Sequence, residues 1–508
     1  MLQHLRLCLA AAAFAAGLSG PAGAQNAAPP AGSPGTASPA PSAAIAPLTL
    51  EDCVKRALQN GFDVEIQRFT PAIAQSAVDV ARGAFIPTLS LTGSQSHANT
   101  GPVGSAPGTK SDAGLTNLGV TQLLSTGATA SLSTGLNRSE SDPASLTGFY
   151  NPAYASDFTV SVTQPLLSGA GRTVTLATLN RARIGQQRAD YDFMAQVLNI
   201  VEQTEGAYYN LVYTREQLTV YQVSLDLANR LLEEAQEKKA VGTATDVDVL
   251  QAQVGVASAR SNVLTAEKSV KDSADALLAL IGRFDLDAPL GATKLEDFRG
   301  ELPVSQSSYE LALRHQPDYL SAKMQLDQLK LDLVVAQNAL KPTLNVNGAL
   351  GFNGTRGSGG DALSSAVSRD NNTWQVGFTF SYPWGQVSNR ARYLQSLATL
   401  NQQTLIVRQL EQNILVQVRS AVRAVETNNE KVKIAVVGTD YSTKEYDLEI
   451  ARFAAGLATS RDVLQAQSDL QNARVAELQA RVTLQNSISA LHRLEGSSLE
   501  RYHLTVPE

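Results

Sequence analysis

The chain repeats itself, and this duplication constrains the fold more than any other feature. Residues 242–253 (GTATDVDVLQAQ) and 456–467 (GLATSRDVLQAQ) are identical at nine of twelve positions, at an offset of 214 (456 − 242). Upstream, FIPTLSLTG (Phe85–Gly93) matches LKPTLNVNG (Leu340–Gly348) at an offset of 255 (342 − 87). Because the offset falls, the first copy carries an insertion before Gly242. A duplicated chain predicts a pseudo-symmetric structure in which each motif is one of a pair.

The N-terminal residues have the pattern of an export sequence. A basic start, an apolar run (Leu7–Leu18) and the small residues before position 25 predict a signal peptide over residues 1–24. Residues 25–46 are rich in Ala, Pro, Ser and Gly and predict a disordered linker. Cleavage leaves Cys53 as the sole cysteine, which excludes an internal disulfide. The net charge of −6, without a basic block, disfavours a nucleic-acid partner.

Two long segments, residues 172–240 and 388–455, predict helices of about 100 Å. Apolar residues recur in heptads in the first, and the pattern resumes over 247–264 and 463–494, so each long helix is expected to return as a hairpin. A second apolar stripe on 388–455 indicates two neighbours, as in a ring of helices. A plain dimeric coiled coil is the alternative, but it leaves the strands unexplained. One seam reads Val197, Thr204, Leu211, Leu218, Leu225 and Leu232.

Four short segments alternate between apolar and small polar residues. Residues 374–382 place three aromatic rings and a valine on the same face as Trp374, with Gln, Gly, Thr and Ser on the other. Residues 88–92, 158–163 and 343–352 alternate in the same way. Strands with this pattern, flanked by aromatic residues, are typical of an outer-membrane β-barrel, although one face of a soluble β-sandwich alternates equally well.

Four strands cannot close a barrel, since the smallest barrels have about eight. The pattern therefore predicts that several copies of the chain assemble. The inserted segment Gly119–Leu136 fits a further hairpin. The sequence leaves open whether this hairpin joins the barrel wall. Beyond the signal peptide no apolar run reaches about 18 residues, so no transmembrane helix is expected.

The export sequence, the duplicated helix–strand–strand–helix units and the Gly-x-Ala-Thr-x-x-Asp-Val-Leu-x-Ala-Gln turn resemble the TolC-like outer membrane efflux factors. The resemblance implies an α+β membrane protein, a trimer whose twelve-strand outer-membrane β-barrel takes four strands per chain. The barrel is expected to continue into a long periplasmic α-helical barrel of coiled-coil hairpins. We expect repeats over 47–283 (with an insertion at about 94–155) and 306–496, an equatorial connector over 284–305 and a C-terminal tail over 497–508.

The resemblance also implies the function and the partners. It predicts an outer-membrane channel of a tripartite efflux or type I secretion system in a Gram-negative bacterium, with a large periplasmic portion. The expected partners are two further copies in a homotrimer, a periplasmic adaptor protein, an inner-membrane transporter driven by protons or ATP, and outer-membrane lipid. The alternative is a trimeric coiled-coil surface stalk or adhesin, which predicts an uninterrupted heptad run followed by a C-terminal barrel.

The helical turns are the predicted periplasmic tips. The resemblance makes Gly242, Thr243, Gly456 and Leu457 candidate adaptor contacts, although turn geometry alone accounts for them equally well. Thr245 or Asp246 in the first copy, and Thr459 or Ser460 in the second, can cap the returning helices.

The resemblance also points to a constriction at these tips. Asp248 and Asp462 match its tip aspartates and predict a negative ring that favours cations and whose crowding raises the apparent pKa. The alternative is that both are first-turn acids favoured by the helix dipole. The family's second constriction acid falls on Gln465 here, and the residues that lock its gate fall on Phe453 and Ala458. Substitute gate ion pairs are expected between Arg452 or Arg461 and Asp246 or Asp248.

Catalytic and metal chemistry has little support in the sequence. The five histidines show no ligand spacing, and no Ser/His/Asp grouping stands out. Residues 168–173 (SGAGRT) lack the lysine and the spacing of a phosphate-binding loop. We therefore expect a passive conduit with no cofactor and no enzymatic activity.

Overall fold

The computed structural model describes residues 49–102, 108–142, 150–282, 295, 302–368 and 371–502. The predicted signal peptide, the linker, nearly all of the connector over 284–305 and the last six residues lie outside the described residues. The predicted boundaries of the two repeats stay predictions. The described residues belong to one compact unit, Ala46–Glu508.

The duplication is visible in matched helix lengths. Each half opens with helices of 11 and 22 residues, α1 and α2 in the first and α6 and α7 in the second. A long helix of 64 or 68 residues follows in each half, and a return helix of 35 or 36 residues completes it. The helix bounds are α1 Leu50–Asn60, α2 Phe62–Gly83, α3 Arg172–Thr175, α4 Ala177–Ala240, α5 Asp246–Leu280, α6 Ser305–His315, α7 Pro317–Asn338, α8 Gly359–Val367, α9 Val387–Ala454, α10 Ser460–Glu495 and α11 Ser498–Arg501.

The return helix of each half ends against the short opening helix. Gly282 has φ +72°, and a Cβ there would lie 2.0 Å from the Asn60 carbonyl oxygen. Gly496 has φ +74°, and a Cβ there would lie 2.7 Å from the His315 carbonyl oxygen. Only glycine fits such an approach. The segments Ala57–Asn60 (ALQN) and Ala312–His315 (ALRH), which are related at the same offset of 255, therefore end at equivalent backbone junctions.

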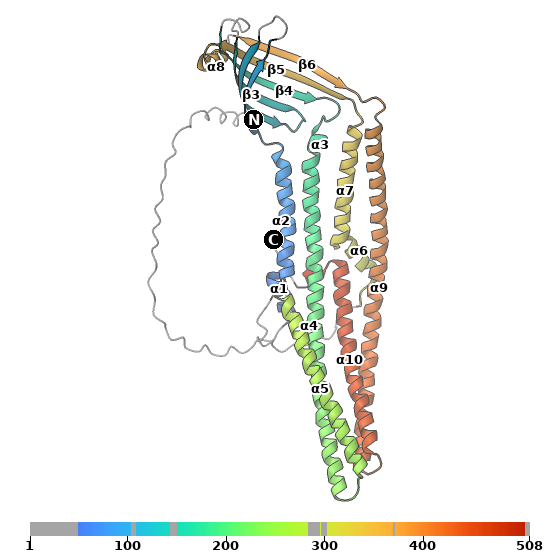
Figure 1. Cartoon of the computed structure of the whole chain (residues 1–508). Coiled ribbons are helices and arrows are strands. Elements are labelled where there is room, and N and C mark those ends of the chain that lie inside the picture. The colour runs from blue at the N-terminus through green and yellow to red at the C-terminus, as the bar shows by residue number, and fades with distance from the viewer. Residues whose placement is uncertain are drawn as a thin grey trace, which may run out of the picture. The chain divides into compact units, whose positions relative to one another are not determined.

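The helices lie side by side in one layer that is four helices wide (Figure 1). Near the sheet the order across the layer is α2, α4, α7 and α9, and towards the far ends it is α5, α4, α10 and α9. The two predicted long hairpins, α4–α5 and α9–α10, are confirmed. The layer has two lateral edges, formed by α2 and α5 on one side and by α9 on the other.

Residues of both stripes predicted on the segment 388–455 lie in one buried core, which α9 shares with α6, α7 and α10. Ile414, Val418, Val422 and Val425 are fully buried and pack with apolar residues of α10, including Ile488. In the first half, the seam of α4 packs into a core with α1 and α5. Helix stability therefore comes from long-range packing of the heptad positions rather than from an isolated coiled-coil pair.

All strands form a single antiparallel sheet in the order β1-β2-β3-β4-β5-β6. The expectation of four strands per chain is wrong, because the inserted segment contributes two full strands, β2 and β3, within the sheet. In the described part of the chain no second sheet packs against this one, so it is not one face of a sandwich. The strand bounds are β1 Thr88–Thr100, β2 Thr109–Leu123, β3 Thr129–Asp142, β4 Ala153–Pro165, β5 Thr343–Arg356 and β6 Asn372–Ser381.

A proline sets the switch from helix to strand in both halves. Pro87 follows the end of α2, and Pro342 follows the end of α7. The residue before a proline is pushed into extended conformations, so a helix cannot continue through these positions. The chain therefore enters β1 and β5 directly after the two prolines.

Candidate functional site

The two helical turns have the same backbone geometry. Gly242 and Gly456 adopt φ of +79° and +74°. The N–H of Thr243 donates to the Lys238 carbonyl at 2.9 Å, and the N–H of Leu457 donates to the Arg452 carbonyl at 2.8 Å. This is a left-handed glycine C-cap, which a side chain at either position would strain. All four predicted adaptor contacts, Gly242, Thr243, Gly456 and Leu457, are exposed.

The tip aspartates close a capping box at the start of each return helix. Asp248 accepts hydrogen bonds from the Thr245 backbone N–H at 2.9 Å and from its hydroxyl at 2.6 Å. Asp462 accepts the equivalent bonds from Thr459 at 2.9 and 2.8 Å. The threonine hydroxyls in turn accept the backbone N–H of the aspartates. Both carboxylates therefore cap the N-terminus of a return helix.

These hydrogen bonds also set the charge of the tips. The Thr245 hydroxyl and N–H lower the pKa of Asp248 below its usual 3.8. The Thr459 N–H and hydroxyl lower the pKa of Asp462 in the same way. Both side chains are ionised at neutral pH in a single chain. The raised pKa expected from crowding in a ring requires further copies and stays a prediction.

Asp246 and Arg452 form their ion pairs within their own hairpins. Asp246 forms an ion pair with Lys239 across its own turn. Arg452 lies 2.6 Å from Glu449, one turn earlier in α9. Ion pairs between Arg452 or Arg461 and the aspartates of the first turn are not among these contacts, so a gate of that kind stays a prediction.

A contact that sequence reasoning missed joins the two hairpins near their tips. Lys238 Nζ of α4 donates to the Phe453 carbonyl of α9 at 2.8 Å and lies 3.5 Å from the centre of its ring. Phe453 is 6% exposed and packs against Leu231 and Val463. The two partners are 215 residues apart in sequence, so no local pattern links them. We call this pair the Lys238–Phe453 clamp.

A groove of about 640 Å³ lies above the clamp, between α4, α5 and α10. Its α5 wall presents the exposed side chains of Val247, Leu250 and Val254, and Arg461 and Leu464 of α10 line the opposite side. At the closest approach a Cβ on Gly255 would lie 2.8 Å from Leu464. The side chains of Val247, Leu250 and Val254 stay 60–63% exposed in this groove.

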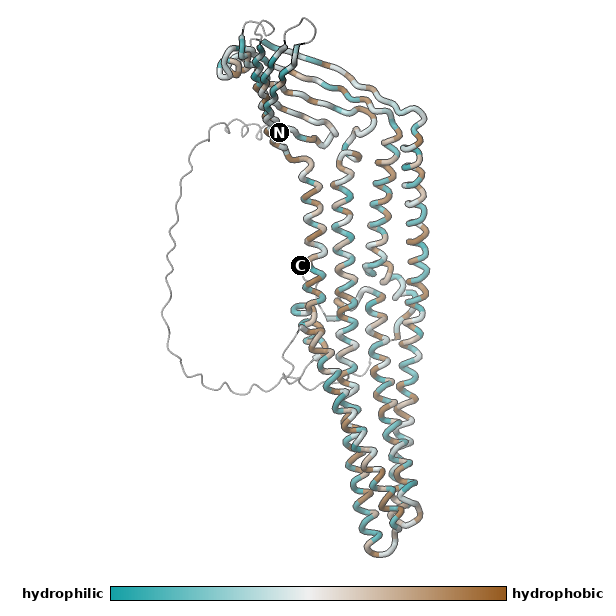
Figure 2. Tube along the Cα trace, in the orientation of Figure 1, coloured by the Kyte–Doolittle hydropathy of each residue, from teal (hydrophilic) through white to brown (hydrophobic). Residues whose placement is uncertain are grey.

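The sheet has one apolar face and one polar face. Apolar and polar residues alternate along the strands (Figure 2), and the register aligns the apolar positions of all six into one band. Phe378, near the middle of β6, is 76% exposed. The opposite face carries Thr, Ser, Asn, Gly and Gln. The band consists of Leu89, Leu91, Leu118, Val120, Leu132, Phe158, Val160, Val162, Val346, Leu350, Phe352, Trp374, Val376, Phe378 and Phe380.

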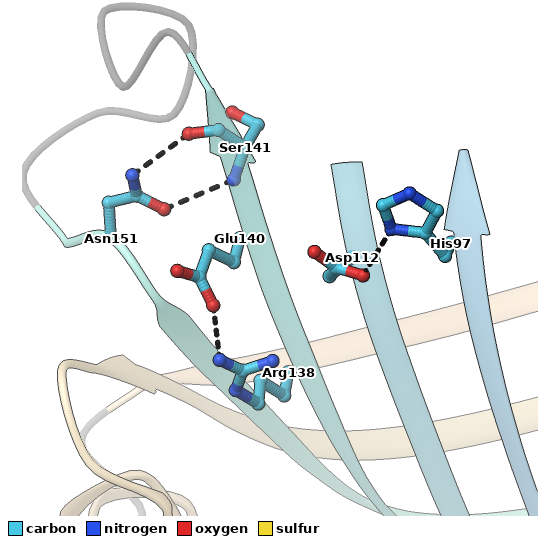
Figure 3. A network of polar contacts seen from close by, with 6 residues as sticks. All are labelled: His97, Asp112, Arg138, Glu140, Ser141 and Asn151. Carbon is cyan, nitrogen blue, oxygen red and sulfur yellow. Dashed lines mark hydrogen bonds and ion pairs between the residues drawn. The ribbon is translucent and has the colours of Figure 1, made fainter. Parts of the chain in front are cut away.

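Polar side-chain pairs replace the band at the strand ends far from the helices. His97 of β1 lies 2.7 Å from Asp112 of β2, and Arg138 pairs with Glu140 on β3 (Figure 3). Asn151 holds the end of β3 by donating to the Ser141 carbonyl at 2.9 Å and accepting its N–H at 3.1 Å (Figure 3). The apolar face is thus bounded by polar groups at its distal rim.

The short helix α8 covers part of this rim. Ser156 of β4 is buried and donates to the Ala362 carbonyl at 2.6 Å. A Cβ on Gly354 of β5 would lie 2.7 Å from Ser365, so α8 rests directly on the backbone of the sheet. Its outward side chains, Leu363 and Val367, are exposed and extend the apolar surface.

The sequence of this chain matches a known protein family. A family model described as "Outer membrane efflux protein" matches residues 122–283 and 308–497, more than half of the chain. The chain belongs to the outer membrane efflux protein family. Nothing in this membership supports the stalk or adhesin alternative, and the strands lie between the helices instead of following them.

Individual relatives of this outer membrane efflux protein are more distant. It is 24% identical over 321 residues to the pyoverdine export outer membrane protein OpmQ of Pseudomonas aeruginosa, covering 61% of this chain and 64% of the relative. It is 24% identical over 309 residues to the outer membrane protein TolC of Escherichia coli, covering 58% and 61%. The matched regions therefore span less than two thirds of these relatives.

Solved structures share the fold over most of the chain. The outer-membrane channel OprN superposes with a TM-score of 0.69 at 18% identity, covering 88% of this chain and 90% of that structure. The Campylobacter jejuni CmeC outer membrane channel gives 0.65 at 19% identity, covering 88% and 86%.

Two further properties of the described residues bear on function. None of their helices is both long and apolar enough to cross a membrane. They also contain no cluster of three or more His, Cys, Asp or Glu side chains that would hold a metal ion.

Proposed function

We propose that this protein is the outer-membrane exit duct of a tripartite efflux or type I secretion system of a Gram-negative bacterium. The sheet lies in the outer membrane with its apolar band towards lipid and its polar face towards a water-filled lumen. The helices extend into the periplasm and continue the lumen as a tunnel. The protein is a passive conduit rather than an enzyme.

The apolar band carries this proposal. A soluble protein rarely exposes a contiguous apolar surface of this extent, and the side chains of the band are exposed on every strand. Lipid satisfies such a face, while the polar opposite face requires water. In a membrane, unpaired strand edges must also be closed, because the hydrocarbon core offers no hydrogen bonds.

Closure requires further copies of the chain. The outermost strands, β1 and β6, each have one neighbour in the sheet. We propose a homotrimer, the state implied by the resemblance to TolC-like factors. The exposed tips then meet a periplasmic adaptor through Gly242, Thr243, Gly456 and Leu457, and the adaptor connects them to an inner-membrane transporter driven by protons or ATP. Asp248 and Asp462, repeated in each copy, line the periplasmic constriction.

A pair of neighbouring substitutions tests the membrane orientation of the sheet. Phe378→Arg places a charge in the lipid-facing band, and Thr379→Arg places the same charge on the lumen face. A lipid-facing arginine at mid-membrane costs about 2–4 kcal/mol in barrels of this kind. We expect the first variant to lose heat-stable assembly in outer-membrane extracts and channel activity in planar bilayers.

The lumen variant serves as the matched control and is expected to assemble normally with altered conductance. Equal behaviour of the two variants, or a wild-type protein that does not partition into detergent and conducts no ions, contradicts the proposal.

A further inference from the structure

The number of strands in the sheet determines how much of a barrel wall each copy supplies. The sheet has six strands, and the extra pair, β2 and β3, lies inside it, between β1 and β4. The hairpin is paired over its whole length, from Thr88↔Thr121 at the helix-proximal end to Lys110↔Asp142 at the distal rim. It is therefore part of the sheet rather than a loop above it.

The hairpin has the same two faces as its neighbours. Val120 of β2 pairs with Leu89 of β1 and with Leu132 of β3, so the apolar band crosses the hairpin without a break. On the opposite face, Asn117 of β2 pairs with Gly135 of β3. Strands that present apolar groups on one side and small polar groups on the other, in register with lipid-facing neighbours, satisfy the requirements of a barrel wall.

The strands are also staggered as a closed barrel requires. A row of directly paired residues crosses the sheet from Leu89 to Trp374. Leu89 lies one residue from the helix-proximal end of β1, and Trp374 lies seven residues from the helix-proximal end of β6. This stagger of about six residues, or roughly 20 Å, accumulates over five strand spacings of about 4.8 Å each. The strands would thus tilt by about 40°, within the 35–45° typical of barrels. The row is Leu89, Val120, Leu132, Val160, Leu350 and Trp374.

The two sheet edges are suited to each other. β1 leaves the helical layer and β6 returns to it, so β6 of one copy and β1 of the next run antiparallel when placed side by side. An even number of strands per copy preserves this alternation around the ring. The open edges expose backbone groups that demand a partner strand.

The width of six strands matches the helices beneath them. Six strands spaced by about 4.8 Å and tilted by about 40° span an arc of roughly 38 Å. Four helices packed at 8–10 Å span roughly 32–40 Å. Four strands would span only about 25 Å and would force the wall to taper.

We propose that all six strands of each copy are barrel staves, and that copies join through the β6 and β1 edges. Three copies of this sheet then form a barrel of 18 strands as wide as the helical tunnel below it. Barrels of 16–18 strands leave an open aqueous channel, so this end of the duct has no constriction of its own. The inference rests on the proposed function and adds the contribution of β2 and β3 to the wall.

Single-cysteine labelling tests whether the hairpin is in the wall. The native Cys53 is buried, and burial raises the pKa of its thiol to about 12, so it stays unreactive. Leu132→Cys and Ser133→Cys place a thiol on either face of β3, and Val160→Cys and Thr159→Cys do the same on β4. Full-length protein in vesicles is treated with a water-soluble maleimide, or labelled with bimane and quenched by nitroxide on lipid acyl chains.

We expect the water-soluble maleimide to label Ser133→Cys and Thr159→Cys, and the lipid nitroxide to quench Leu132→Cys and Val160→Cys. If only the β4 pair shows this contrast, the hairpin lies outside the wall and the six-stave inference is wrong. If neither pair shows it, the proposed membrane function itself fails.

Crosslinking between copies tests the edges. Leu91→Cys on β1 is combined in turn with Val376→Cys, Phe378→Cys and Phe380→Cys on β6, all on the apolar face. One combination is expected to give an oxidised ladder that ends at the trimer. The control replaces Leu91→Cys with Leu132→Cys on β3, and a ladder from the control instead would show that β1 and β2 are excluded from the ring.

Discussion

Asp462 caps a helix and, in the proposed trimer, contributes to the selectivity ring. Its carboxylate accepts two hydrogen bonds from Thr459 at the start of α10, and Asp248 repeats the arrangement at α5. A test of the ring must therefore remove the charge and keep the cap. Asparagine does both, because its amide oxygen still accepts the threonine N–H.

We expect the double substitution Asp248→Asn with Asp462→Asn to weaken the preference for cations, since a negative ring would be neutralised. Because the cap hydrogen bonds lower the pKa of both carboxyls, the wild-type preference should persist as pH falls from 8 to about 4 and disappear below it. Reversal potentials in planar bilayers measure both effects.

Asp469→Asn, at a half-buried position of α10 seven residues beyond Asp462, is the control for loss of one charge away from the tips. Unchanged selectivity in the double variant would assign the aspartates to capping alone. Loss of the wild-type preference already near pH 6 would instead show that crowding in the ring outweighs the cap hydrogen bonds.

At the scale of elements, the clamp is one of the contacts that join the two hairpins of one chain. Lys238 contacts both the carbonyl and the ring of Phe453, while its neighbour Lys239 pairs within the first hairpin. Lys238→Met keeps the aliphatic stem and removes the charge, and Lys239→Met is a matched control one residue away.

We expect Lys238→Met to loosen the tips by about 1–2 kcal/mol, from the lost cation–π contact and hydrogen bond. Amide exchange at residues 450–463 should then accelerate by roughly five- to thirtyfold, and the open fraction of the channel should rise. The control should change neither quantity. Equal exchange in the two variants would mean that apolar packing of Phe453 alone holds the hairpins.

At the scale of the whole molecule, both edges of the helical layer expose apolar side chains. On one edge, Val247, Leu250 and Val254 of α5 are exposed in the groove beside α4 and α10. On the other edge, α9 exposes a stripe at helical spacing. The outermost strands follow the same edges, because β1 continues from α2 and β6 leads into α9. The α9 stripe is Ile434, Val437, Tyr441 and Leu448.

We expect Leu250→Asp to weaken association of the copies, because the interface would then bury an unpaired charge. Native mass measurement in detergent should shift from trimer towards monomer. Gln253→Asp is the control, since Gln253 is exposed and outside the apolar stripe. A trimer of unchanged stability in Leu250→Asp would show that the stripe of α5 does not lie between copies.

The sequence predicted the elements that depend on short-range rules. The heptads predicted long helices, the turn glycines predicted reversals, and Thr245 and Thr459 were among the predicted caps, because each of these signals acts within a few residues. Alternation in β6 was equally clear. The strand count was wrong because β2 and β3 are rich in Gly, Ser and Thr, and weak strands of this kind take their structure from their neighbours.

The duplicated sequence alone therefore determined that the protein has two matched helical hairpins with capped tips and a sheet with one apolar face. Only the tertiary structure decided that six strands share one sheet, that their stagger suits a barrel, and that Lys238 of one hairpin seats on Phe453 of the other. The physical reason is the separation along the sequence of the residues that interact. Helical periodicity and capping are encoded in neighbouring residues, whereas strand pairing and contacts between hairpins join residues tens to hundreds of positions apart, which the folded chain alone brings together.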